Sequence, residues 1–121
     1  MLKLQKCHGD SFLRGGHLQT LWGHFVPSPP LRGERKIHLV PLPDKDQLHC
    51  SVIEGKSPFV ISLFHGLSGD INSDYMRRTA NLMQELGHTV ILVNHRGAGE
   101  GFQYAKNPYH SGRAEDISEV L

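Results

Sequence analysis

Two short apolar runs, separated by a segment of helix length, constrain the fold of this chain most. Residues 59–64 are apolar except for Ser62, and residues 90–93 are apolar throughout. Runs of this length are typical of strands in a sheet that is covered on both faces. The segment 75–86 between them has apolar residues at helical spacing, at Met76, Ala80, Met83 and Leu86. Strand, amphipathic helix and strand in this order predict one right-handed βαβ unit.

The residues that flank the expected helix indicate where it begins and ends. Asp70, Asn72 and Asp74 mimic the start of a calcium loop, but Tyr75 and Asn81 stand where such a loop needs Gly and Glu. We therefore interpret this stretch as helix capping, with Ser73 or Asp74 at the start. Gly87 is expected to end the helix in the left-handed conformation.

Two further β-like stretches precede the βαβ unit. They cover residues 36–42 and 47–53, and the second alternates apolar and polar side chains. Pro43-Asp44-Lys45-Asp46 between them is typical of a hairpin turn, so an antiparallel pair is predicted.

Residues 1–35 show no strong periodicity and contain Gly15, Gly16 and three prolines. We expect them to be an N-terminal extension of loop or extended structure.

The end of the chain predicts the start of one more helix. Over residues 111–121, one side carries Ile117, Val120 and Leu121, and the other carries Glu115, Asp116 and Glu119. Asp116 is expected on the exposed or N-terminal part of that helix. A domain of this type usually needs roughly 200–250 residues. Residues 36–121 are therefore expected to be the N-terminal portion of an α/β domain whose C-terminal portion is absent.

Composition excludes several functional classes. The 121 residues carry a formal net charge of +1, with the charges scattered along the chain. This balance gives no electrostatic argument for nucleic acid or for an anionic membrane surface. No apolar run approaches the roughly 20 residues that span a bilayer, and the N-terminus lacks a signal-peptide core. A cytoplasmic protein without cofactor is expected, with Cys7 and Cys50 as free thiols, although one disulfide between them stays open.

The sequence His65-Gly66-Leu67, directly after the first apolar run, is the main candidate for chemistry. The C-terminal ends of strands in an open α/β sheet are where ligands bind. In hydrolases of this layout a backbone N–H just after such a strand helps to form the oxyanion hole. We therefore predict the Leu67 N–H as an oxyanion donor, with His65 and Gly66 shaping the turn. The plainer alternative is a simple turn in which His65 is a hydrogen-bonded core residue.

Other motifs give weaker signals. Residues 97–101 resemble a phosphate loop, but Phe102 stands where a third Gly is needed and no Gly-Lys-Ser/Thr ending follows. We interpret them as a flexible turn at the rim of the site. Arg96 is expected either to pair there with Glu100 or to be solvated or paired structurally. None of the nine histidines has zinc-ligand spacing, and no Gly-x-Ser-x-Gly occurs in the chain.

Four segments together resemble a known family. They are Gly16-His-Leu-Gln-Thr-Leu-Trp-Gly23, His65-Gly-Leu-Ser-Gly69, Asn94-His-Arg-Gly97, and Tyr109-His-Ser-Gly112 followed by Glu115-Asp116. In order and spacing they are similar to the N-terminal part of the YheT-type (hydrolase-4) branch of the α/β-hydrolases. The resemblance implies an incomplete α/β-hydrolase fold and an esterase- or lipase-like serine hydrolase. Only the oxyanion-loop position transfers, to Leu67, because the triad positions have no counterpart here.

Three functional hypotheses follow. In the first, the chain is the N-terminal part of a serine hydrolase whose parent acts on a small-molecule carboxylic ester, and the 121 residues alone are inactive. In the second, it is a non-catalytic α/β binding or interaction module completed by a partner or a second copy. In the third, residues 97–101 bind a nucleotide.

Within the N-terminal segment, Gln19 and Thr20 are expected to hold the leading residues against the sheet, and Trp22 to pack. His17 and His110 are expected to be structural hydrogen-bonding residues near the site.

Overall fold

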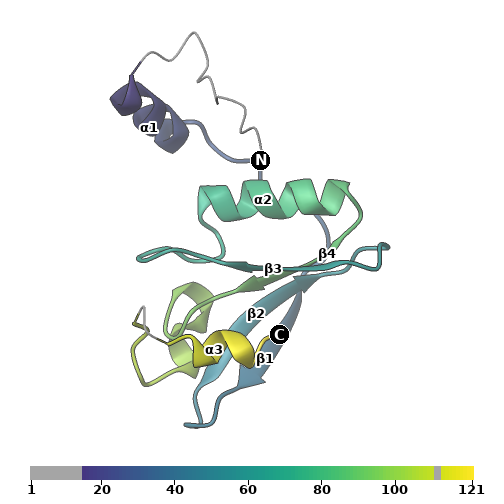
Figure 1. Cartoon of the computed structure of the whole chain (residues 1–121), viewed down its shortest axis with the longest axis vertical. Helices are drawn as coiled ribbons and strands as arrows, with labels where there is room; N and C mark the ends of the chain where they lie inside the picture. The colour runs from purple at the N-terminus through teal and green to yellow at the C-terminus, as the bar shows by residue number, and fades with distance from the viewer. Residues whose placement is uncertain (1–14, 111–112) are drawn as a thin grey trace, which may run out of the picture.

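One mixed sheet with helices on both faces organises the chain (Figure 1). The computed structural model describes residues 15–110 and 113–121, so expectations for Cys7, Ser111 and Gly112 lie outside the described residues. The elements in chain order are α1 (Gly16–Phe25), β1 (Lys36–Pro41), β2 (Gln47–Ile53), β3 (Val60–Phe64), α2 (Asp74–Glu85), β4 (Thr89–Val93), the 3₁₀ helix η1 (Gly99–Tyr104) and α3 (Glu115–Ser118). The strand order is β1-β2-β4-β3.

The predicted hairpin is confirmed. Strands β1 and β2 pair antiparallel, with Lys36 opposite Val52 and Pro41 opposite Gln47. The turn closes through hydrogen bonds between Leu42 and both Lys45 and Asp46, and Lys45 takes a φ of 73°. Because the turn is this tight, Asp44 and Asp46 are held side by side at one end of the sheet.

The predicted βαβ unit is also confirmed. Strands β3 and β4 are parallel, from Val60 opposite Thr89 to Phe64 opposite Val93, and α2 crosses between them. Gly87 ends α2 with a φ of 80°, as expected. Ser73 is the N-cap residue, but its hydroxyl accepts the Asp70 N–H instead of capping the helix.

Apolar side chains pack on both faces of the sheet. Under α2, a cluster joins Met76 and Ala80 of the helix to Ile53, Val90 and Leu92. On the opposite face, where η1 and α3 lie (Figure 1), a second cluster contains Leu48, Cys50 and Val93, with Val120 packed against it. Leu86, expected on the buried face of α2, is 59% exposed, because it lies beyond the last residue of the helix.

Strand β3 differs from its sequence-based prediction. Its apolar run was expected to be covered on both faces, yet Phe59 is 62% exposed and Val60 58% exposed. The reason is position, since β3 is an edge strand that pairs only with β4 among the described residues. An exposed apolar edge strand is unusual in a native protein. Its unpaired backbone groups can pair with a strand of another chain, which favours aggregation.

The N-terminal segment is helical where loop or extended structure was expected. Helix α1 lies apart from the sheet, beyond α2 (Figure 1). Thr20 donates to Gly16 O of its own helix at 2.9 Å, so it does not hold the segment to the sheet as predicted. The side chain of Gln19 is outside the described residues, and Trp22 is 50% exposed.

The residues after α1 are instead bound to α2. Arg78 donates to Val26 O and to Ser28 Oγ, both at 2.7 Å. Asn81 donates to Pro30 O and accepts the Arg32 N–H, each at 3.0 Å. Over the part of the chain that the structure describes, no helix has the length and apolar character needed to cross a membrane.

Candidate active site

The loop after β3 folds into a tight turn at the carboxyl ends of the parallel strands. Gly69 N–H donates to Gly66 O at 3.1 Å, and Ser68 has a φ of 61°, as the third position of a type II turn requires. Gly66 N–H donates to the Tyr75 hydroxyl at 2.6 Å. Leu67 stands at the tip, with its side chain 83% exposed. Within the described residues its backbone N–H donates no hydrogen bond.

His65 is buried, and both of its ring nitrogens have a hydrogen-bond partner. Its Nε2 accepts the His95 backbone N–H at 3.0 Å, and its Nδ1 lies 2.9 Å from Gly66 O. Because Nε2 must be an acceptor, these contacts assign the proton to Nδ1, which donates to Gly66 O. His65 is therefore a hydrogen-bonded core residue, as the plainer alternative predicted, and it also contacts the turn that carries Leu67.

His95 contributes in a way the sequence did not indicate. Its Nε2 lies 3.0 Å from His65 O, and its ring stacks on Tyr109 at 4.1 Å between centroids. Burial and the neighbouring His65 lower the pKa of His95, which favours the neutral ring. His65 and His95 are 30 residues apart, so no local sequence pattern indicates that they touch. Only the parallel register of β3 and β4 could have predicted the contact between them.

A cleft of about 450 Å³ opens beside the loop. His65, Ser68 and Gly69 line one side, whereas Gly66 and Leu67 are not among its lining residues. Residues 96–98 form another part of the lining, and the remainder comes from η1 and the loop after it, namely Phe102, Ala105, Lys106, Asn107, Pro108 and Tyr109. The cleft thus lies where ligands bind in open α/β sheets, at the carboxyl end of adjacent parallel strands.

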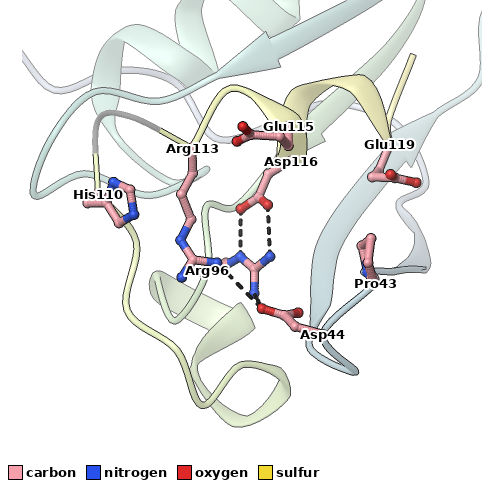
Figure 2. A pocket seen from close by; sticks show the side chains of 8 residues that line it. All are labelled: Pro43, Asp44, Arg96, His110, Arg113, Glu115, Asp116 and Glu119. Atoms are coloured by element: carbon pink, nitrogen blue, oxygen red, sulfur yellow. Dashed lines mark hydrogen bonds and ion pairs between the residues drawn. The ribbon is translucent and has the colours of Figure 1, made fainter.

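Arg96 is the centre of a buried ionic network. Its Nε and Nη2 donate to the two carboxylate oxygens of Asp116 at 2.7 and 2.8 Å, and its Nη1 donates to Asp46 at 3.0 Å. Figure 2 shows the guanidinium between Asp116 and Asp44, facing a cleft of about 410 Å³. These carboxylates raise the pKa of Arg96, with Asp116 the largest cause.

This network decides between the alternatives for Arg96 and corrects part of the expectation for Asp116. Arg96 is paired structurally, as one alternative held, and does not pair with Glu100, whose carboxylate instead lies near Arg35 and His49. Asp116 was expected on the exposed or N-terminal part of its helix. It lies in the first turn of α3, but it is only 5% exposed. The bidentate bond to Arg96 is the reason, because it turns α3 so that Asp116 faces inward.

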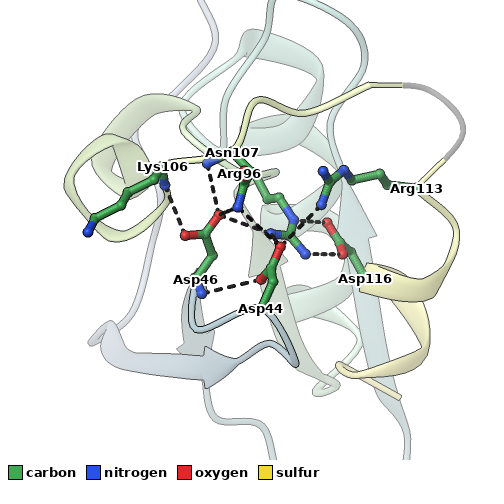
Figure 3. A network of polar contacts seen from close by, with 7 residues as sticks. All are labelled: Asp44, Asp46, Arg96, Lys106, Asn107, Arg113 and Asp116. Atoms are coloured by element: carbon green, nitrogen blue, oxygen red, sulfur yellow. Dashed lines mark hydrogen bonds and ion pairs between the residues drawn. The ribbon is translucent and has the colours of Figure 1, made fainter.

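Asp46 extends the network to a fourth segment (Figure 3). It accepts the backbone N–H groups of Lys106 and Asn107, both at 3.0 Å. These two bonds are the main reason that the pKa of Asp46 falls to about 2. The network thereby joins the hairpin turn, the loop after β4, the cleft wall and α3. Because every one of these charges has an opposite partner, the network is structural and offers no free acid or base.

The glycine-rich turn does not suit a phosphate. Residues 99–104 form a 3₁₀ helix, and a Cβ at Gly99 would lie 2.8 Å from the Asp70 Cβ and 3.0 Å from its Oδ2. Asp70 and Glu100 put negative charge beside the turn, and Arg35, which lies near it, is paired with Glu100 at 3.5 Å. Among the described residues, no group of three or more His, Cys, Asp or Glu could hold a metal ion.

Comparison with known proteins supports the fold. The sequence matches no protein-family profile and no curated protein. In structure it is similar to the esterase Pf2001 of Pyrococcus furiosus, with a TM-score of 0.52 and 21% sequence identity. The similarity covers 62% of this chain and 32% of the esterase, so the chain spans well under two thirds of that protein. The described residues therefore form part of an α/β-hydrolase fold.

Proposed function

We propose that this chain forms the oxyanion-loop part of an esterase-like serine hydrolase of the YheT-type branch, acting on carboxylic esters. The observation that carries the proposal is the Leu67 N–H at the tip of the turn after β3. It has no hydrogen-bond partner among the described residues, although its neighbours Gly66 and Gly69 both have one. The structural similarity to an esterase supports the same class of chemistry.

Ester hydrolysis needs only one group from these residues, the backbone N–H of Leu67. A serine supplied from outside these residues attacks the ester carbonyl, and negative charge develops on the carbonyl oxygen. The Leu67 N–H donates to that oxygen, together with a second N–H beside the serine. Removing one such donor costs about 3–4 kcal/mol of transition-state stabilisation. With no nucleophile in a Gly-x-Ser-x-Gly frame, the 121 residues alone are inactive in this proposal.

A pair of variants at one position tests the donor. Leu67→Pro removes the N–H, and proline suits the second position of a type II turn. Leu67→Ala keeps the N–H and removes only the side chain. A monoalkyl phosphonate ester, a tetrahedral monoanion, is titrated while the backbone amides of residues 66–69 are followed by NMR. Saturable shifts in the wild type and Leu67→Ala, lost in Leu67→Pro, are expected. Equal binding by Leu67→Pro would refute the role of the N–H.

The parent activity needs a separate measurement. We expect a species heavier than this chain in the native source that gains one adduct from a fluorophosphonate probe, read by intact mass. A species with the mass of this chain and no adduct would remove the hydrolase proposal.

The exposed edge of β3 favours the second candidate, an interaction module. Phe59 and Val60 are exposed next to backbone groups that pair with no other described strand. A strand from a partner or a second copy would cover them. Light scattering across a concentration series separates the candidates, because a stable self-complementary module should form a discrete dimer with a sharp unfolding transition.

A further inference from the structure

We propose that His95 is a positioning residue for the oxyanion loop, which it holds through reciprocal hydrogen bonds with His65. These contacts between His65 and His95 form a histidine clasp. This inference rests on the proposed function, because it concerns how the Leu67 N–H is aimed.

The clasp joins the first residue after β3 to the second residue after β4, at the carboxyl ends of two neighbouring parallel strands. His95 donates its backbone N–H to His65 Nε2 and its ring Nε2–H to His65 O, both at 3.0 Å. The two rings meet edge to face at 4.5 Å between centroids. His65 is 6% exposed and His95 is 7% exposed, so water competes little for these bonds.

The clasp and the hydrogen bonds from His65, Gly69 and Tyr75 together orient two successive peptide planes. The first plane joins His65 to Gly66, and its carbonyl is held by His95 while its N–H is held by the Tyr75 hydroxyl. The second plane joins Gly66 to Leu67, and its carbonyl accepts both the His65 Nδ1–H at 2.9 Å and the Gly69 N–H at 3.1 Å.

The second plane is the one that carries the Leu67 N–H. A trans peptide unit is flat, so its N–H points opposite to its C=O, and the described chain has no cis peptide bond. Once two donors hold the Gly66 carbonyl, the direction of the Leu67 N–H is set, and no bond to Leu67 itself is needed. His95 thus acts on the Leu67 N–H through His65 and without touching the reacting atoms.

The His95 ring also connects the clasp to the wall of the cleft. Tyr109 stacks on it with an angle of 16° between the ring planes, and Tyr109 lines the cleft beside the loop. The same side chain therefore positions the loop and one wall of the neighbouring cleft.

Three variants separate positioning from packing. His95→Phe keeps a ring against Tyr109 and removes the donor to His65 O. His95→Gln restores a side-chain N–H donor. His38→Phe is the matched control, since His38 is exposed on β1 and lies outside the cleft. Amide hydrogen exchange is followed by NMR at Gly66 and Gly69 for the loop and at Leu92 for the core.

We expect exchange at Gly66 and Gly69 to be at least tenfold faster in His95→Phe, with Leu92 unchanged. His95→Gln should return the loop amides to within about threefold of wild type, and His38→Phe should have no effect. The imidazole nitrogens of wild-type His65 should show one neutral form, protonated at Nδ1. Loop exchange within twofold of wild type in His95→Phe, or a His65 ring protonated at Nε2, would overturn the proposal.

The phosphonate titration keeps this proposal separate from the proposed function. If the phosphonate binds the wild type, binding should weaken about tenfold in His95→Phe and remain unchanged in His38→Phe. If His95→Phe binds as tightly as the wild type, the positioning role is wrong although the function stands. If the wild type does not bind the phosphonate, the proposed function fails, and with it the role of His95 in aiming a donor.

Discussion

Replacing Arg96 should destabilise this protein more than replacing any single carboxylate around it. Arg96→Met keeps much of the side-chain volume and removes the charge. The side chain of Arg96 is 4% exposed, and those of Asp46 and Asp116 are 5% and 7% exposed. Without the guanidinium, the buried carboxylates of Asp46 and Asp116 lose their cationic partner, and the 37% exposed carboxylate of Asp44 lies beside them.

The magnitude follows from what is left behind. Removing one partner of a buried ion pair costs about 3–5 kcal/mol, because an uncompensated charge remains buried. Asp116→Asn should cost less, about 1.5–3 kcal/mol, since Arg96 keeps Asp44 and Asp46 and only a charged hydrogen-bond partner is lost. The matched control is Arg32→Met, which breaks an ion pair with Glu85 whose side chains are 63% and 57% exposed. That change should cost under about 1 kcal/mol.

Urea unfolding, followed by circular dichroism, measures the three free energies of unfolding. A common m-value across the variants would show that the midpoints compare stability alone. The reasoning is refuted if Arg96→Met costs no more than Arg32→Met. A larger loss in Asp116→Asn than in Arg96→Met would also contradict the placement of Arg96 at the centre of the network.

Three further predictions concern single residues. The pKa of Asp46 is lowered to about 2 in the folded protein. Its contribution to stability is therefore present above its unfolded pKa of about 4 and is lost as the pH falls toward 2. Asp46→Asn should flatten the dependence of the urea midpoint on pH between about pH 4 and about pH 2. Gly55→Ala should destabilise the protein more than Gly87→Ala, because a Cβ at Gly55 would lie 2.3 Å from Gly87 O. A Cβ at Gly87 meets open space, and its only cost is the φ of 80°. Urea unfolding should show a loss of about 1–2 kcal/mol for Gly87→Ala and a greater loss for Gly55→Ala. Burial raises the pKa of Cys50 to about 11, so in a Cys7→Ser background a disulfide reagent at pH 8 should label it only after unfolding, and rapid labelling of the folded protein would contradict its burial.

Local sequence patterns were sufficient for most of the framework. Alternation predicted the hairpin, the apolar runs predicted β3 and β4, and the spacing of Met76 and Ala80 predicted the buried face of α2. Gly87 predicted the end of that helix. These features depend on residues within a few positions of one another, so a single sequence records them directly.

The same reasoning failed where partners are distant. Arg96 contacts Asp44 and Asp116, which lie 52 and 20 residues away, and the burial of Arg96 and Asp116 does not follow from a local pattern. The apolar run of β3 predicted a covered strand, because composition does not say which strand is at an edge. Helix α1 was missed since Gly15, Gly16 and the prolines after it indicate loop, and only its spaced apolar residues favour a helix.

For the candidate site, the sequence alone determined which peptide groups follow β3, and it predicted the Leu67 N–H as the donor. Its direction was decided only by tertiary structure, through the histidine clasp, the Tyr75 hydroxyl and the turn to Gly69. The physical reason is that residue order and strand periodicity are local properties of the chain. The orientation of a peptide plane depends on donors and acceptors that only the parallel pairing of β3 with β4 brings within hydrogen-bond distance.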